Sequence, residues 1–158
     1  DCWGWATWKR GWKLFNPNAN ILLEKLSLDE ELKKMFNFNN TYNYIAMLEK
    51  QITGEIDSWA IRWYASCFLK NKLTLYPGKS LITNIGLDGE GTHCSSTDDY
   101  NTLLYKHKLE IQNIAIKESL IARKYFENYF KSITNKSNKN KTKNDFVSKL
   151  KNYIFKKL

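Results

Sequence analysis

Asp57 is a carboxylate that could act as a general base, because it stands at the start of an apolar helical pattern, two residues before Trp59. A carboxylate beside aromatic side chains can take a proton from a substrate hydroxyl where a pocket opens next to it. The alternative interpretation is structural. Asp57 could cap the helix or lie in its first turn, where free backbone N–H groups and the helix dipole stabilise an acid. The local sequence favours this structural interpretation.

Segment 84–93 is a second candidate, because it combines closely spaced glycines with polar side chains. Glycine lets a backbone approach a ligand closely, and backbone N–H groups can face a phosphate. The segment matches neither the P-loop pattern nor the dinucleotide fingerprint, so a ligand loop and a plain surface turn fit it equally. We retain Asn84, Gly86, Gly89 and Gly91 as substrate-binding candidates, and His93, with Asp88 and Glu90 nearby, as a candidate metal ligand.

The first eight residues form a third candidate, in which Trp3, Trp5 and Trp8 are spaced around Gly4. Flat aromatic faces can stack on sugar rings as well as on each other. Gly4 would allow a ligand or a neighbouring backbone to pack closely. The alternative is that these tryptophans fill a core, although one or two facing a cleft would be enough for a site.

Helices and a few short strands are predicted to position these residues. Ile56, Trp59, Ala60, Trp63 and Cys67 have the spacing of one buried helical stripe, and apolar neighbours widen it until the helix should be buried on most sides. A capping-box pattern beginning at Ser27 predicts a helix that ends near residue 36. Further helices are expected from residue 21, over 44–52 and over 118–133, and short strands over 73–76, 80–85 and 109–111.

Charge divides the 158 residues, whose net charge is +9, into two unlike parts. Residues 1–100 hold 11 Lys and Arg against 12 Asp and Glu, whereas residues 101–158 hold 14 against 4. A compact basic nucleic-acid-binding domain is therefore not expected, and we predict no nucleic-acid partner. We expect a flexible linker over 134–143 and a basic amphipathic helix over 144–158, which could lie on an anionic membrane surface or pack on protein.

Three cysteines without a CxxC pair indicate neither a disulfide framework nor a zinc site, and they fit a reducing compartment. The dense apolar start, Cys2 to Trp5, leads us to expect that an upstream part of the protein is missing. No thiol nucleophile is predicted, because no base lies at a recognisable spacing from a cysteine.

Three blocks together resemble the C-terminal half of a family 2-like, GT-A glycosyltransferase of bacterial surface-polysaccharide type. In chain order they are CWGWATWK with Trp12 and Lys13, IDSWAIRW at residues 56–63, and the segment from Leu75-Tyr76-Pro77 through NIGLDGEGTH at 84–93. The resemblance covers residues 2–94, and residues 101–158 carry no motif of it. It implies an α/β fold: the helix-rich C-terminal half of a GT-A domain with a few short strands, followed by a helical tail.

The resemblance implies that Asp57 is the catalytic base of an inverting sugar transfer from a nucleotide-sugar donor to an acceptor hydroxyl. Trp3, Gly4, Trp5 and Trp59 would line the sugar site, the glycine-rich segment would close over the donor diphosphate, and His93 would contact the metal or the diphosphate. On this basis residues 1–100 form the acceptor and catalytic half, and residues 101–133 a strand-helix extension.

The nucleotide-binding half of such enzymes, with its Asp-x-Asp motif, has no counterpart in this sequence. A divalent metal, Mn²⁺ or Mg²⁺, is expected for the full-length enzyme, and the chain alone is not expected to turn over. The expected acceptor is a saccharide or a lipid-linked saccharide, and the transferred group a hexosyl or N-acetylhexosaminyl unit. A cytoplasmic location follows, with attachment to the inner face of the plasma membrane. The alternative function is a non-catalytic module that binds membrane surfaces or polyanions through the basic tail.

Overall fold

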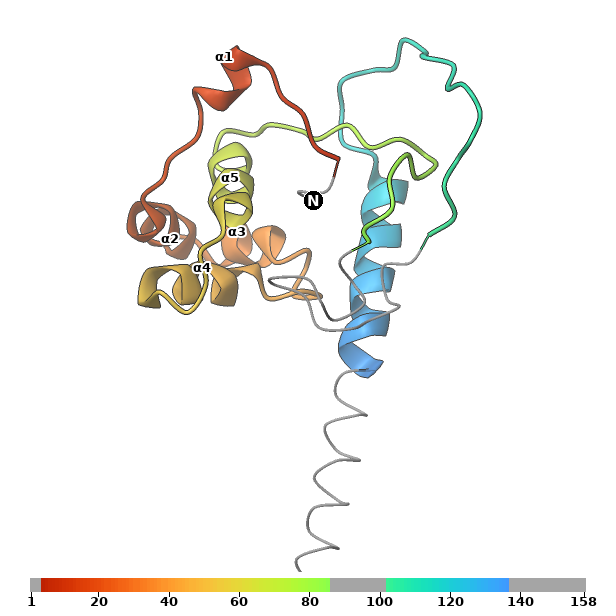
Figure 1. Cartoon of the computed structure of the whole chain (residues 1–158). Coiled ribbons are helices and arrows are strands. Elements are labelled where there is room, and N and C mark those ends of the chain that lie inside the picture. The colour runs from red at the N-terminus through yellow and green to blue at the C-terminus, as the bar shows by residue number, and fades with distance from the viewer. Residues whose placement is uncertain (1–3, 86–101, 137–158) are drawn as a thin grey trace, which may run out of the picture.

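The computed structural model describes residues 4–85 and 102–136, and within these ranges it is helical (Figure 1). A short helix near the N-terminus is followed by four longer ones that pack together, and a further helix lies beside this group. The labelled helices are α1 (Lys9–Trp12), α2 (Ala19–Ser27), α3 (Glu30–Phe36), α4 (Tyr44–Thr53) and α5 (Trp59–Phe68), and we name residues 120–136 the C-terminal helix.

Short polar side chains start each of the four longer helices, and in two cases the capping residue differs from the prediction. The Asn18 side chain accepts from the backbone N–H groups of Asn20 and Ile21 in α2. Asp29 caps α3, whereas Ser27, the predicted cap, is the last residue of α2. Ser58 caps α5, so Asp57 is neither its cap nor in its first turn. Side-chain oxygens at these positions satisfy N–H groups that have no partner inside the helix.

The connection between α3 and α4, residues 37–43, is rich in asparagine. Phe38, Asn39 and Asn40 have φ of 49°, 54° and 59°, in the left-handed region that asparagine tolerates better than most residues. The loop is held from inside, because Asn37 is buried and its Oδ1 accepts from the backbone N–H of Ile45 at 3.0 Å. Residues 37–43 are therefore an ordered loop, which we name the platform loop.

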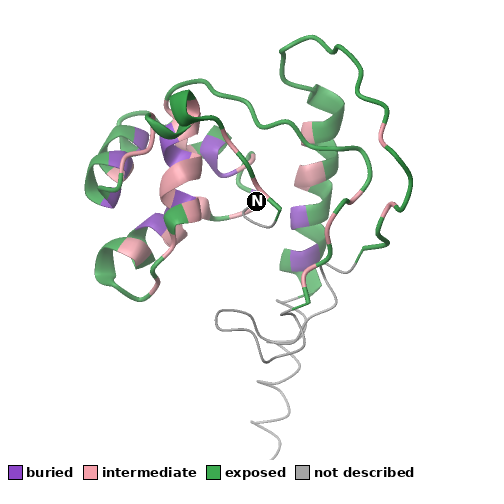
Figure 2. Cartoon of the chain, turned by 45° about the horizontal axis from the view of Figure 1, so that its top comes forward, coloured by how far each residue is buried: buried purple, intermediate pink, exposed green. Residues whose placement is uncertain are grey.

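The core lies where α2, α3, α4 and α5 meet, and Figure 2 shows the buried residues on the inward sides of these helices. Its largest fully buried side chains are Leu26, Phe36 and Leu48. Burying one such side chain contributes about 1.5–3 kcal/mol. The other members are Ala19, Leu22, Ile45, Ile61 and Ala65.

The face of α5 that enters this core is not the predicted one. Ile61 and Ala65 are buried in it, whereas Trp59 is 39% exposed. The predicted tryptophan stripe faces the N-terminal segment instead, and aromatic rings from that segment cover it in part. Periodicity places residues on one face of a helix but does not say which neighbour covers that face. In α5, the helical core covers one face and the N-terminal segment covers part of another.

The predicted α/β fold is wrong, because the described residues contain no strand or sheet. The expected strands at 73–76, 80–85 and 109–111 are irregular, and Ile111 is 98% exposed. The backbone N–H of Tyr105 does donate to the Ser80 carbonyl at 2.8 Å, but no ladder follows. A strand needs repeated pairing with a neighbour, and β-type residues alone do not supply it. The GT-A-like architecture implied by the resemblance is therefore not seen here.

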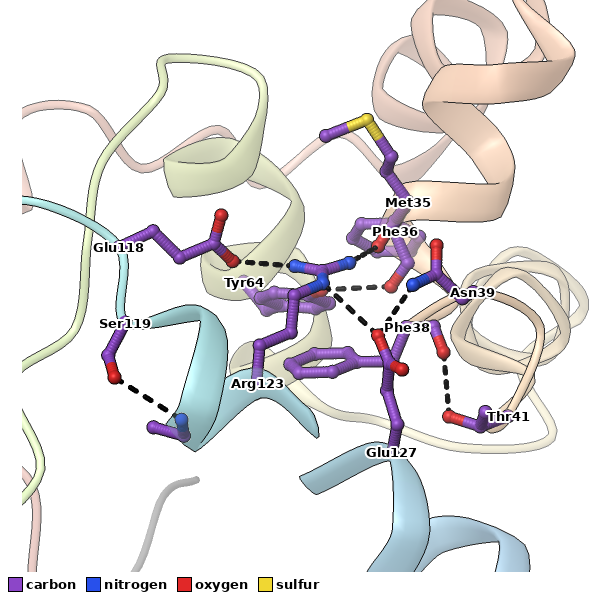
Figure 3. A network of polar contacts seen from close by, with 11 residues as sticks. Met35, Phe36, Phe38, Asn39, Thr41, Tyr64, Glu118, Ser119, Arg123 and Glu127 are labelled. Carbon is purple, nitrogen blue, oxygen red and sulfur yellow. Dashed lines mark hydrogen bonds and ion pairs between the residues drawn. The ribbon is translucent and has the colours of Figure 1, made fainter. Parts of the chain in front are cut away.

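The C-terminal helix was predicted over 118–133 and is observed from residue 120 to the end of the described chain at 136. Phe130 and Ile133 are buried, and the Phe130 ring packs against Phe38 of the platform loop at 5.3 Å. Arg123 links this helix to the same region by donating to the Met35 carbonyl, and Asn39 Nδ2 donates to Glu127 of the helix (Figure 3). Residues 134–136, expected to begin a linker, continue the helix, whereas residues 137–158 lie outside the described part.

None of the helices in the described ranges combines the length and the apolar character that a membrane crossing requires.

Candidate functional site

A cluster of four tryptophans joins the N-terminal segment to α5. The Trp5 ring lies 5.0 Å from the Trp59 ring and 5.6 Å from the Trp63 ring, and Trp12 lies 5.3 Å from Trp63. Such tilted and edge-to-face pairs are the favoured aromatic arrangements. We name Trp5, Trp12, Trp59 and Trp63 the tryptophan cluster. The structure thus brings together Trp5 and Trp59, two predicted sugar-site residues from separate parts of the sequence.

Gly4 is the point where the N-terminal segment meets the chain before the glycine-rich loop. It has a φ of +61°, and a Cβ built on it would lie 2.6 Å from Ile82 Cγ2. Glycine is therefore required here both by the backbone conformation and by the close approach. Because Ile82 is two residues before Asn84, the first and third sequence blocks lie next to each other. Asn84 itself is half-buried.

The tryptophan cluster is only partly covered. Trp59 is 39% exposed and Trp12 is 42% exposed, and Trp8, one helical turn before Trp12, is 69% exposed. The predicted core role for these tryptophans is therefore incomplete, since each keeps an accessible edge or face. Large exposed aromatic side chains close together are typical of binding surfaces.

Asp57 lies one residue before the Ser58 cap of α5, with a side chain that is 89% exposed. Its Oδ1 is held by Arg62 Nη2 at 3.0 Å. An exposed ion pair of this kind contributes little to stability, because water screens it. Its effect is to give an accessible carboxylate a defined partner next to the tryptophan cluster.

Arg62 is a site residue that sequence reasoning did not single out. Its Nε donates to the Ser58 carbonyl at 3.2 Å, and its guanidinium lies 6.0 Å from the centre of the Phe15 ring. Only 19% of the side chain is exposed, so the guanidinium that faces Asp57 is fixed from several sides. A signal was present in the sequence, because arginine occurs three times against 22 lysines, which makes each arginine position worth testing.

The anchoring of the N-terminal segment on α5 continues beyond the tryptophans. The backbone N–H of Asn16 donates to Ser66 Oγ at 3.0 Å, and Ser66 Oγ donates to the Arg62 carbonyl at 2.7 Å. Ser66 is buried, so these bonds are shielded from water. These hydrogen bonds hold the C-terminal end of the N-terminal segment at Asn16, while the ring contacts of Trp5 and Trp12 hold its middle.

The remaining predicted residues cannot be placed relative to this site. Trp3, Gly86, Gly89, Gly91 and His93 lie outside the described residues, as does the predicted basic helix at 144–158. Across residues 4–85 and 102–136, no three His, Cys, Asp or Glu side chains gather as a metal site would require. The metal site and the contact with a membrane surface therefore stay predictions.

Two further features bear on alternative chemistry. Burial raises the pKa of the Cys67 thiol, which opposes a thiolate nucleophile at neutral pH.

A hollow of about 380 Å³ lies between α3 and α4, lined by residues that include Lys33, Tyr42 and Glu49. It is built from none of the predicted site residues, so it provides no pocket for Asp57.

Comparison with family models, with curated proteins and with solved structures gave no match to this chain.

Proposed function

We propose that this chain is the acceptor-binding and base-carrying part of an inverting glycosyltransferase. The observation that carries the proposal is the Asp57 carboxylate, which is 89% exposed, paired with a fixed Arg62 and two residues from the exposed Trp59. A general base must reach the proton of its substrate, and the Asp57 carboxylate supports this role by being exposed and oriented by Arg62. A cap or first-turn acid, the alternative interpretation of the sequence, would have its oxygens turned to the helix N–H groups.

The tryptophan cluster supplies the second requirement, a surface that can hold a sugar. Pyranose rings present C–H faces that pack on aromatic rings, while their hydroxyls remain free to react. Trp12 and Trp59 come from different elements and lie 6.3 Å apart, and both keep an exposed portion. Their packing on Trp5 and Trp63 pre-organises these two rings, which lowers the entropy lost when a sugar binds.

In the proposed reaction, Asp57 accepts the proton of an acceptor hydroxyl. The hydroxyl oxygen then forms a bond to the anomeric carbon of a nucleotide-sugar, and the bond from that carbon to the diphosphate oxygen breaks. The leaving group departs as the nucleoside diphosphate, and a single displacement inverts the anomeric configuration. Arg62 acts as a positioning residue, because its contact is with Asp57 and not with the reacting atoms.

The proposal places neither the donor nor its metal on the described residues. The described residues gather no metal-ligating group, and His93 is not among them. No step of the proposed reaction is therefore routed through a metal. The donor-binding half is expected from a polypeptide that adds a nucleotide-binding domain to this chain.

Asp57→Asn tests the proposal, since it keeps the size of the side chain and removes the base. Transfer is measured in the protein that joins this chain to a nucleotide-binding half, with a panel of nucleotide-sugars and saccharide acceptors. We expect transfer to fall by about 10²–10⁴-fold, with acceptor binding and the thermal unfolding midpoint near those of the wild type. Glu24→Gln is the matched control, because Glu24 is an exposed acid on α2 whose loss should leave transfer unchanged.

A binding experiment tests the acceptor role in the chain itself. Tryptophan emission is followed while neutral and acidic oligosaccharides are added to the wild type and to Trp59→Ala. We expect a saturable change that Trp59→Ala weakens by about tenfold or more. Transfer that survives in Asp57→Asn, or tryptophan emission that no oligosaccharide alters, would contradict the proposed function.

A further inference from the structure

The three arginines of the chain share one feature, since each guanidinium lies over an aromatic ring: Arg10 over Trp8, Arg62 over Phe15 and Arg123 over Phe38. Two of the three also neutralise carboxylates. Arg62 holds Asp57, and Arg123 holds Glu118 and Glu127. Arg10 forms no ion pair with any carboxylate in the described part of the chain, and it stands on α1 two residues before Trp12 of the tryptophan cluster.

Arg10 stands on α1, between Trp8 and Trp12. The guanidinium carbon lies 5.0 Å from the centre of the Trp8 ring, and Trp8 is 69% exposed. Stacking of this kind orients the planar guanidinium and leaves its N–H edge free to donate two parallel hydrogen bonds. Such a fork matches a carboxylate or a phosphate better than it matches a neutral hydroxyl.

The surroundings of Arg10 strengthen its positive field. Lys9 and Lys13 lie on the same short segment, both are exposed, and neither pairs with a carboxylate in the described ranges. α1 has no acid in its first turn. This local excess arises within a region, residues 1–100, whose Lys and Arg are otherwise balanced by Asp and Glu. It is therefore a feature of α1 and not of a generally basic surface.

We propose that the acceptor saccharide bound at the tryptophan cluster is acidic, and that Arg10, supported by Lys9 and Lys13, binds its anionic group. This inference rests on the proposed function and specifies the substrate class. The shared chemistry is an oxyanion attached to a sugar unit next to the one that lies on Trp12 and Trp59. A uronic-acid carboxylate and a phosphate ester both supply it.

The test uses the full 158-residue chain and three matched tetrasaccharides. One contains glucuronic acid, the second is the same molecule with its carboxyl groups reduced to alcohols, and the third is the reduced molecule with a phosphate monoester. Affinity is measured by tryptophan emission and by calorimetry at low and high salt. We expect the wild type to bind at least one acidic form about tenfold more tightly than the neutral form at low salt, with the difference shrinking at high salt.

Arg10→Gln should abolish the preference and leave binding of the neutral tetrasaccharide unchanged. Folding is not at risk, because α1 contributes no buried residue. Lys25→Gln is the matched control for net charge, since Lys25 is an exposed lysine in the last turn of α2. It should keep the preference. Which acidic form is favoured identifies the source of the oxyanion.

Two results would overturn the inference: equal wild-type affinity for acidic and neutral forms, or a preference that persists in Arg10→Gln. Both leave the proposed function standing, because the neutral form still binds at the tryptophan cluster. If none of the three tetrasaccharides binds, the proposed acceptor role fails, and this inference fails with it.

Discussion

Arg123→Met should weaken the attachment of the C-terminal helix to the rest of the protein without unfolding the helical core. The Arg123 guanidinium pairs with Glu118 at 2.8 Å and with Glu127 at 3.3 Å, and it donates to the Met35 carbonyl at 2.9 Å (Figure 3). It also lies 4.9 Å from the centre of the Phe38 ring. Methionine keeps an unbranched apolar side chain of similar length, so the substitution removes mainly these polar contacts.

The expected loss follows from the contacts that cross between the helix and the rest of the protein. The ion pairs with Glu118 and Glu127 lie within residues 118–127, so they orient Arg123 but do not join the helix to the core. The hydrogen bond from a charged donor to the Met35 carbonyl contributes about 1.5 kcal/mol, and the contact with Phe38 about 0.5–1 kcal/mol. We expect a total loss of about 2–2.5 kcal/mol, which corresponds to about 30- to 70-fold more frequent opening.

Native-state hydrogen exchange measures this opening residue by residue. In Arg123→Met, amides of residues 120–136 should exchange faster by that factor, while amides in α2, α4 and α5 keep their protection. Lys124→Met is the matched control, because Lys124 is exposed on the same helix and has no ion pair in the described chain. Unchanged exchange in the C-terminal helix, or equal loss of protection in α4, would refute this account of how the helix is held.

Three further predictions test the core, the N-terminal segment and a buried phenol. Leu48→Ala should lower the free energy of unfolding by about 2–5 kcal/mol in urea titrations, because Leu48 is fully buried, whereas Ile52→Ala, at a position 37% exposed, should cost less. Gly4→Ala should shift tryptophan emission to longer wavelength, because the added methyl group displaces the N-terminal segment from Ile82. Gly54→Ala is the control, since φ there is also positive, +77°, but nothing lies within 4 Å of the added carbon. It should lower the free energy of unfolding by about 1 kcal/mol without altering the emission. Burial raises the pKa of Tyr64, so the folded state keeps the phenol proton to higher pH than the unfolded state does. This stabilisation is complete below about pH 10 and is lost as the pH rises further, so the stability advantage of the wild type over Tyr64→Phe, measured by urea unfolding, should shrink progressively above about pH 10.

Local signals in the sequence were enough to predict most helices. The turn at residues 16–18 precedes α2, and the end of α4 at Gly54 has the left-handed conformation, φ 77°, that glycine favours. The helices over 44–52 and 118–133 were also predicted close to their observed positions, 44–53 and 120–136. These features depend on backbone propensities and capping, which act over a few residues. The strands failed for the opposite reason, because their stability depends on partners that these segments do not have.

The candidate site was likewise predictable from the sequence only in part. Residue type and spacing directed attention to Asp57, Gly4, Trp5 and Trp59, because carboxylates, glycines and tryptophans each have a limited range of roles. The contact of Gly4 with Ile82 and the pairing of Asp57 with Arg62 arise from residues brought together by packing and by the turn that precedes α5. The two faces of α5 show the same limit, because the helical period is a local property, whereas the partner of each face is chosen by the whole chain.

By itself, then, the sequence determined where most of the helices lie, that the charge excess lies in the last third, and which side chains could do chemistry. Only the tertiary structure decided that Asp57 is exposed and paired, that four tryptophans form one cluster, and that Arg10 has no carboxylate partner in the described chain while Arg62 and Arg123 do. Hydrogen bonds within a helix connect residues four apart and can be inferred from short patterns. Ion pairs and aromatic contacts between distant segments depend on how those segments pack together.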